Sequence, residues 1–348
     1  MFGRNFAPKK RGMPLPIKIL RLLLSLTMML ILGLVVLQAF TYFSGEKIDQ
    51  DPQAILKQLR SDPQGAILTL ISSQKILSNL GILSNLSNSK KEPNFPPKPK
   101  ISPVGNPVLK FAIVSDSHND NNNLTKALSM AKEKGAKFVI GLGDYTATGT
   151  LPELRSTKET FDNGGLPYYL TVGDHDLWES REKKLPAIAN FNQVFASPYQ
   201  SFVDSNTRFV IVNNSDNYEG VDSLEFSWLM DTLKTTSENT RLVLVFLHEP
   251  LYHPTSDRVM GGAIDEPVIA GVGLKEQAKR LEDLLKSSGV GAVFAGNIHA
   301  YSEYEGKSGI PMFTVGAVTA DRNVQLPRFA IVDVFENGSY NVEDIEIK

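Results

Sequence analysis

The stretch VLKFAIVSDSHND, residues 108–120, decides how the folded part of this chain is organised. Its first half is a short apolar run rich in branched and aromatic residues, which is typical of a buried strand. The run is followed at once by Asp116 and His118, two side chains that can carry chemistry. Because ligands of α/β folds gather at the carboxyl ends of strands, this position indicates a functional site.

The same arrangement, an apolar run that ends in polar residues, recurs along the chain. The runs are KFVIGLGD at 137–144, PYYLTVGDHD at 167–176, TRFVIVNNSD at 207–216, RLVLVFLHEP at 241–250 and VGAVFAGNIH at 290–299. Helical patterns lie between them, near residues 122–134, 152–161, 224–233 and 274–286. After Tyr301 three strand-like segments follow without helices. We therefore predict an α/β fold, a four-layer αββα sandwich in which two mixed sheets pack face to face with helices outside.

The composition of the 348 residues limits the possible functions. With 42% hydrophobic and 21% charged residues, the chain is an ordinary globular protein by composition. It contains no cysteine, so a metal site must use His, Asp, Glu or Asn. The first 44 residues contain six basic residues and no acid, so the remaining residues carry −8 within a net charge of −2. This acidic balance indicates no nucleic-acid binding surface.

The N-terminal segment has the pattern of a membrane anchor. Residues 22–43 carry no charged side chain, and about 20 apolar residues are enough to cross a bilayer core. We predict a cytoplasmic basic tail at 1–18 and a transmembrane helix at 19–44. The positive-inside rule then predicts a single-pass protein of the cytoplasmic membrane with an extracytoplasmic folded domain. A cleaved signal peptide, with Leu37–Ala39 at the cleavage site, and a buried core helix stay open as alternatives.

Two further segments are expected before the folded domain. Residues 45–88 have helical character and are predicted to form a stalk. Residues 89–107 are rich in Pro and Lys, which predicts a stiff, extended linker without packed structure. The folded domain is therefore expected at residues 108–348.

Five of the predicted strand ends supply acids, histidines and an amide in a fixed order. They are Asp116 and His118, then Asp144, then Asp174, His175 and Asp176, then His248, and finally Asn297 and His299. A single residue of this kind at a strand end more often belongs to a turn than to a metal site. Several carboxylates and imidazoles brought together would be costly without a cation that compensates their charge. Mixed oxygen and nitrogen ligands suit Mn²⁺, Fe or Zn²⁺.

The order of these motifs resembles the signature of the calcineurin-like metallophosphoesterases, which reads DxH, GD, GNH(D/E), H and GHxH. Between residues 108 and 319 this chain reads DSH, GD, GDHD, H and GNIH. The resemblance implies a metallophosphoesterase domain at 108–348 that binds two divalent metal ions. It makes Asp116, His118 and His299 ligands of the first ion, Asp144 a bridge between both, and Asp174, His248 and Asn297 ligands of the second.

The resemblance also implies a reaction, the hydrolysis of a phosphomonoester or phosphodiester. A metal-activated hydroxide would attack phosphorus, because two neighbouring ions lower the pKa of water and neutralise the phosphoryl oxygens. His175 corresponds to the non-ligand histidine that protonates the leaving oxygen, and Asp176 would orient it. The chain would then be a membrane-anchored, metal-dependent phosphoric ester hydrolase whose partner is a phosphoester substrate.

Two positions depart from the family pattern, and both fall on the second ion. Asp174 stands where the family has Asn, and Asn297 stands where it has the first His of GHxH. The exchange adds a negative charge and leaves oxygen ligands, which favour Mn²⁺ or Mg²⁺ over Zn²⁺ at this site. Mn or Fe is the expected metal, with Zn or Mg as alternatives. Because the Asn side chain is shorter than His, we expect the second site to be weak.

Two other functions stay open at this point. A protein of the same fold that has lost turnover through Asp174 and Asn297 would bind only metal or phosphate, although the presence of His175 and Asp176 argues against this. A tethered interaction module, in which the stalk matters more than the pocket, is the other alternative. The loop at 252–273 is expected to border the pocket and to select substrates.

Overall fold

The computed structural model describes residues 102–195, 197–235, 240–262 and 273–348. Within these ranges no helix has both the length and the apolar character needed to cross a bilayer. The predicted tail, membrane helix and stalk, residues 1–88, lie outside the described residues, and so do residues 89–101 of the predicted linker. The described residues cover the predicted folded domain except for three short gaps.

The first sheet has five strands in the order β11-β10-β1-β2-β3. Three of them are parallel, namely β1 (Pro107–Val114), β2 (Val139–Gly141) and β3 (Tyr168–Leu170). β10 (Arg328–Phe335) pairs antiparallel with both β1 and β11 (Tyr340–Glu346). The sheet is therefore mixed. Its parallel strands are connected by α6 (Asn121–Glu133) and α7 (Leu151–Gly164).

The second sheet has six strands in the order β4-β5-β6-β7-β9-β8. Its four central strands are parallel, namely β5 (Thr207–Ile211), β6 (Leu242–Phe246), β7 (Ala292–Ala295) and β9 (Pro311–Thr314). The edge strands β4 (Gln200–Asp204) and β8 (Ser302–Glu305) are antiparallel to their neighbours. Between these strands lie α10 (Ser223–Lys234) and α11 (Leu274–Ser287).

Three short helices that lie between β3 and β4 in the chain were not predicted from the sequence, and neither were the edge strands β4 and β8. The helices are η1 (His175–Leu177), α8 (Trp178–Glu182) and α9 (Ala189–Val194). With three to six residues each, they are too short to show a clear helical periodicity in the sequence.

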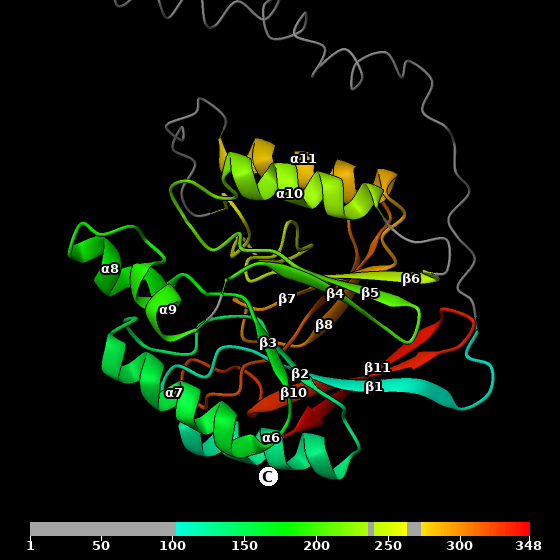
Figure 1. Ribbon diagram of the computed structural model, residues 1–348, viewed down its shortest axis with the longest axis horizontal. Helices are drawn as coiled ribbons and strands as arrows, with labels where there is room; N and C mark the ends of the chain where they lie inside the picture. Colours follow the sequence, from blue (N-terminus) through cyan, green and yellow to red (C-terminus); the bar gives the residue numbers. More distant parts are fainter. Residues whose placement is uncertain (1–101, 196, 236–239, 263–272) are drawn as a thin grey trace, which may run out of the picture. The chain divides into compact units, whose positions relative to one another are not determined.

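Figure 1 shows α6 and α7 beyond the first sheet and α10 and α11 beyond the second, with the two sheets packed between them. The core between the sheets is aromatic. Phe111 of the first sheet meets Phe209 of the second edge to face, with ring centroids 5.2 Å apart. Phe246 and Phe294 stack on neighbouring strands at 5.3 Å. The predicted α/β fold with two mixed sheets and outer helices is therefore confirmed.

Three of the four long helices, α6, α7 and α10, begin at a side chain that caps them. Thr150 and Glu153 form a reciprocal capping box at the start of α7. Asp222 accepts hydrogen bonds from the first turn of α10, and Asp120 does the same for α6. Because α6 and α7 each start soon after a strand of the first sheet, the polar residues between strand and helix are held at the carboxyl edge of that sheet.

One buried acid in this scaffold makes stability depend on pH. Glu225 in α10 is 1% exposed, and its carboxylate accepts a 2.6 Å hydrogen bond from the backbone N–H of Asn213. Burial raises the pKa of Glu225 from 4.5 to about 8, although the Asn213 bond opposes the shift. The folded state therefore binds this proton more tightly than the unfolded state. The resulting stabilisation is complete below pH 4.5 and is lost as the pH rises toward 8.

We expect Glu225→Gln to remove this pH dependence, because the neutral amide occupies nearly the same space. Between about pH 5 and pH 8, the free energy of unfolding of the wild type should fall relative to the variant by about 1 kcal/mol per pH unit. Urea titrations followed by tryptophan fluorescence measure this difference. Glu276→Gln, at an exposed position of α11, serves as the control. Parallel curves for wild type and Glu225→Gln would contradict the shifted pKa.

Candidate metal centre

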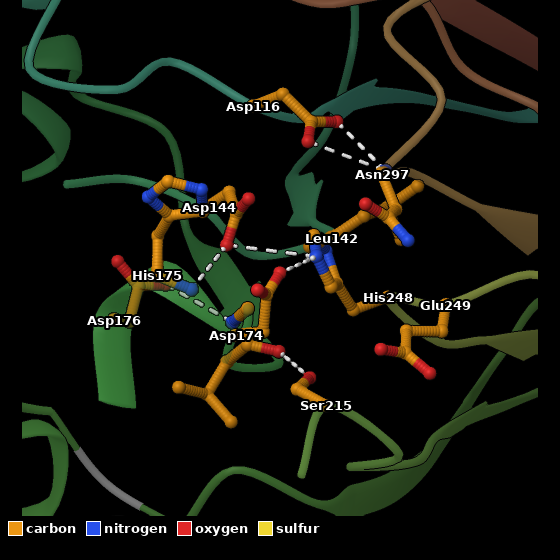
Figure 2. A network of polar contacts seen from close by, with 12 residues as sticks. Asp116, Leu142, Asp144, Asp174, His175, Asp176, Ser215, His248, Glu249 and Asn297 are labelled. Carbon is orange, nitrogen blue, oxygen red and sulfur yellow. Dashed lines mark hydrogen bonds and ion pairs between the residues drawn. The ribbon is translucent and has the colours of Figure 1, made fainter. Parts of the chain in front are cut away.

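The residues singled out in the sequence follow the carboxyl ends of β1, β2, β3, β6 and β7. These strands belong to both sheets, and their ends meet at one edge of the sandwich (Figures 1 and 2). The structure brings together the side chains of Asp116, His118, Asp144, Asp174, His175, His248 and His299. Figure 2 shows the imidazole of His248 between the carboxylates of Asp144 and Asp174.

The first group of ligand atoms joins the end of β1 to the end of β7. The Nε2 atoms of His118 and His299 lie 3.1 Å apart, and Nε2 of His299 lies 3.3 Å from Oδ1 of Asp116. The Asp116 carboxylate is held in place by the backbone N–H of Asn297, at 3.1 Å, and by the Ser115 hydroxyl, at 2.5 Å. One carboxylate and two imidazole nitrogens thus face a common point, as a transition-metal site requires.

Asp144 lies between this group and a second one. Its Oδ2 is 3.6 Å from Nε2 of His118, and its Oδ1 is 3.5 Å from Nε2 of His248. The same nitrogen of His248 lies 3.3 Å from Oδ1 of Asp174. Nδ1 of His248 donates to the carbonyl of Leu142 at 2.7 Å, because a carbonyl can only accept. Nε2 is therefore the nitrogen whose lone pair a metal ion would use once the proton on it is lost.

Burial and the neighbouring charges shift the pKa values of the cluster in different directions. Burial lowers the pKa of His118 to about 4, so its imidazole is neutral near pH 7. Burial also lowers the pKa of His248, but the charge of Asp144 and the hydrogen bond to Asp174 outweigh this and raise the pKa well above its usual value. Burial raises the pKa of Asp144. A cation placed among these carboxylates would therefore be strongly stabilised.

The backbone at the cluster is held in an unusual conformation. Five residues have a left-handed φ between 42° and 64°, namely Asp116, His118, Asp144, Asn297 and His299. Each costs roughly 1–3 kcal/mol for a residue other than glycine, and such strain is typical of functional sites. Gly173 is required for a different reason, since a Cβ there would lie 2.1 Å from the backbone N of Asp144. The glycine of GDHD therefore lets two strand ends approach each other.

His175 is oriented by contacts outside the ligand cluster. Its Nδ1 donates to the carbonyl of Ala147 at 2.8 Å, and its ring stacks on Trp178 with centroids 4.0 Å apart. Its backbone N–H donates to Oδ1 of Asp144 at 3.0 Å. Because Nδ1 is engaged, Nε2 is the nitrogen that can act on a bound ligand.

The expectation that Asp176 orients His175 is wrong. The carboxylate of Asp176 is buried and accepts hydrogen bonds from three backbone N–H groups and one hydroxyl, those of Gly173, Tyr145 and Thr146 together with Oγ1 of Thr146. It ties the loop after β2 to the loop after β3. The carbonyl of Ala147 orients the imidazole instead, a contact that the sequence does not reveal because any residue supplies a carbonyl.

A cavity of about 180 Å³ opens beside Asp174 and His175. Asn297, expected to be a metal ligand, lies in its wall, and its Oδ1 accepts a hydrogen bond from Nη2 of Arg258 at 3.1 Å. Glu249 also lines the cavity, and its Oε2 is buried without a hydrogen-bond partner among the described residues. The expectation that the 252–273 loop borders the pocket is confirmed for its described residues.

Sequence reasoning missed two asparagines that follow β5. Oδ1 of Asn214 accepts from the backbone N–H of His248 at 3.1 Å, so Asn214 fixes the loop that presents this imidazole. Nδ2 of Asn217 donates to Oδ2 of Asp174 at 3.3 Å. The signal was available, because the run NNSDN stands directly after a buried strand, as the other site motifs do.

The donor set fits a pair of divalent ions. Oδ2 of Asp144 is buried and has no hydrogen-bond partner among the residues that the structure describes, although it lies near His118. Asp144 belongs to two groups of closely spaced ligand atoms, one with His118 and His175 and one with Asp116 and His248. A carboxylate shared between neighbouring groups is the arrangement that two adjacent ions require.

Comparison with known sequences points to one family. The family model described as calcineurin-like phosphoesterase matches residues 109–301. Purple acid phosphatase 18 of Arabidopsis thaliana is 26% identical over 146 residues. That match covers 39% of this chain and 30% of the relative, so the chain spans about a third of the length of the curated relative that it matches.

Solved structures with the same fold include a dimetal phosphatase from Danio rerio. It is 14% identical, with a TM-score of 0.50, and the match covers 70% of this chain and 100% of that one. GAP50, the anchor in the inner membrane complex of Plasmodium, is also 14% identical, with a TM-score of 0.51, and the match covers 69% of this chain and 85% of that one. At this level of identity the likeness shows a shared fold.

Proposed function

Because the chain belongs to the calcineurin-like phosphoesterase family, we propose that it hydrolyses a phosphoric ester, either a monoester or a diester, with divalent metal ions. The observation that carries the proposal is the convergence of ligand atoms from five strand ends on one point of the sandwich. A structural ion would need only one such group. The shared carboxylate of Asp144 favours two ions and therefore phosphoryl chemistry.

The residues divide between two ions. Asp116, His118 and His299 would hold the first, and Asp144 would be shared. His248 and Asp174 would hold the second. When bound, the ions would lower the pKa of water and offset the charge on the phosphoryl oxygens.

His175 is proposed to act on the leaving group. Its Nδ1 is bound to the carbonyl of Ala147, so Nε2 is the nitrogen available to a substrate. The residue also lines the cavity beside the cluster. Because Nδ1 keeps its proton in the bond to Ala147, Nε2 carries a proton only in the imidazolium form. That proton would pass to the ester oxygen as the bond between that oxygen and phosphorus breaks, which leaves the neutral imidazole. General-acid help of this kind contributes roughly 10²–10⁴-fold in rate.

The second ion is proposed to be the weaker one. The amide oxygen of Asn297 already accepts a hydrogen bond from Arg258, which leaves His248 and Asp174 beside the shared Asp144. Three donors that include two carboxylates suit Mn²⁺, Fe or Mg²⁺ better than Zn²⁺. Mn or Fe remains the proposed metal.

Metal titration coupled to turnover tests the proposal. The full chain, stripped with a chelator, should regain hydrolysis of an aryl phosphomonoester or phosphodiester as Mn²⁺ is added. We expect one ion to resist a competing chelator and the second to dissociate readily, with activity that follows the second. A protein that binds Mn²⁺ but turns over neither class of ester would support the alternative, a metal- or phosphate-binding protein of the same fold.

We also propose that the folded domain is extracytoplasmic and anchored by the N-terminal apolar segment. The six basic residues that precede this segment support that orientation. Protease added to intact cells, with any outer envelope made permeable, should degrade the domain. A domain that stays intact until the cytoplasmic membrane is broken would reverse the proposed orientation.

A further inference from the structure

Arg258 brings a positive charge to the wall of the cavity. Its Nη2 donates to Oδ1 of Asn297 at 3.1 Å, and both residues line the cavity together with Asp174 and His175. A guanidinium has five N–H donors, so the bond to Asn297 leaves others for a ligand. At about 180 Å³ the cavity is smaller than a typical pocket for a whole organic ligand of roughly 300–1,000 Å³, which suits a phosphoryl group.

The backbone near Arg258 is fixed against the scaffold. The backbone N–H of Arg258 donates to the hydroxyl of Ser256 at 3.1 Å, and the N–H of Met260 donates to the carbonyl of Pro250 at 2.9 Å. Gly261 has a φ of 72° and packs so closely that a Cβ would lie 2.6 Å from the backbone N of Lys275 in α11. These contacts hold the backbone from which the Arg258 side chain extends at the edge of the cavity.

The net charge of the metal site determines how much the positive charge of Arg258 contributes to phosphate binding. With ions bound, the ligands Asp116, Asp144 and Asp174 supply three negative charges, and Glu249, which lines the same cavity, adds a fourth when it is ionised. One divalent ion therefore leaves a net negative charge, which repels a phosphate dianion, whereas two ions bring the net charge to zero or +1. Arg258 adds +1 in either state. Its contribution to phosphate binding should therefore be largest when the weaker second ion is absent.

We propose that Arg258, positioned by Asn297, binds a non-bridging oxygen of the phosphoryl group in the cavity beside Asp174. This inference rests on the proposed function, because it assumes a phosphoryl ligand. Guanidinium groups suit such oxygens, since two N–H donors can bind one phosphate. Asn297, at the position where the family has a metal-binding His, then acts as a positioning residue for Arg258.

Binding of inorganic phosphate to the Mn²⁺-loaded full chain, measured by calorimetry, tests the inference without turnover. Arg258→Gln should weaken phosphate binding by roughly 10- to 100-fold, the loss expected for hydrogen bonds to a charged group. Mn²⁺ binding should be unchanged. The weakening should be larger with one equivalent of Mn²⁺ than with two. Arg280→Gln, at an exposed position of α11, is the matched control and should bind phosphate as the wild type does.

A double variant tests the role of Asn297. Asn297→Ala should weaken phosphate binding less than Arg258→Gln, and the double variant should lose no more than Arg258→Gln alone, because Asn297 acts through the guanidinium. Wild-type phosphate affinity in folded Arg258→Gln would overturn the inference, and so would a wild type that binds no phosphate. A wild type that binds phosphate through Arg258 but hydrolyses no ester would instead refute the proposed function alone.

Discussion

Asp144→Asn is expected to abolish tight metal binding and phosphoester hydrolysis together. The carboxylate lies 3.6 Å from Nε2 of His118 and 3.5 Å from Nε2 of His248, so its charge serves both groups of ligands. The amide is nearly isosteric, and its oxygen can still accept from the backbone N–H of His175. Losing the ions removes several kcal/mol of transition-state stabilisation, which corresponds to a fall in rate of roughly a thousandfold or more.

Metal analysis after gel filtration, with the rate of ester hydrolysis on the same sample, measures this effect. Circular dichroism of the variant checks that it is folded. Asp283→Asn is a suitable control, because Asp283 is an exposed acid of α11 that pairs only with Lys279 among the described residues. Normal metal content in a folded Asp144→Asn protein would rule out the bridging role.

The second large effect is expected for His175→Gln, and it should depend on the leaving group. For an alkyl phosphate, whose leaving oxygen must be protonated, the rate should fall by roughly 10²–10⁴-fold. For an aryl phosphate with an acidic leaving group, the fall should be much smaller. Metal content should stay near that of the wild type, because Ala147 and Trp178 hold the imidazole from outside the ligand cluster.

The metal content of His175→Gln distinguishes a general-acid role of His175 from a role as a metal ligand. This residue also belongs to a group of closely spaced ligand atoms with His118 and Asp144, so a ligand role would lower the metal content of His175→Gln. His253→Gln is the control, because the imidazole of His253 contacts Ser302 and the Tyr304 ring away from the cluster. Equal losses for alkyl and aryl phosphates would mean that His175 is not a general acid.

Each site residue that the sequence predicted was recognised from its immediate neighbours in the chain. Asp116, Asp144 and His248 follow buried strands within a few residues, and parallel strands bring their carboxyl ends to one edge. The fold then determines which residues meet. The four long helices were predicted near their observed positions for the same reason, since their helical pattern is read from neighbouring residues.

The contacts that the sequence did not predict join residues distant in the chain. Asn214 holds the backbone of His248, 34 residues away, and Arg258 meets Asn297, 39 residues away. Neither contact leaves a local pattern. Asp176 was misassigned for a related reason, because its position next to His175 favoured a direct contact, whereas its carboxylate is used by backbone N–H groups. Adjacent residues of a tight turn commonly point in different directions.

The most direct test of the central claim is a crystal structure of the chain grown with saturating Mn²⁺, with the ions located by anomalous scattering. We expect one strong peak within about 2.0–2.3 Å of ligand atoms from Asp116, His118 and His299, with Asp144 reaching toward it. A weaker peak should lie between Asp144, Asp174 and His248. Anomalous density elsewhere, with none at these strand ends, would contradict the assignment of this cluster as a metal centre.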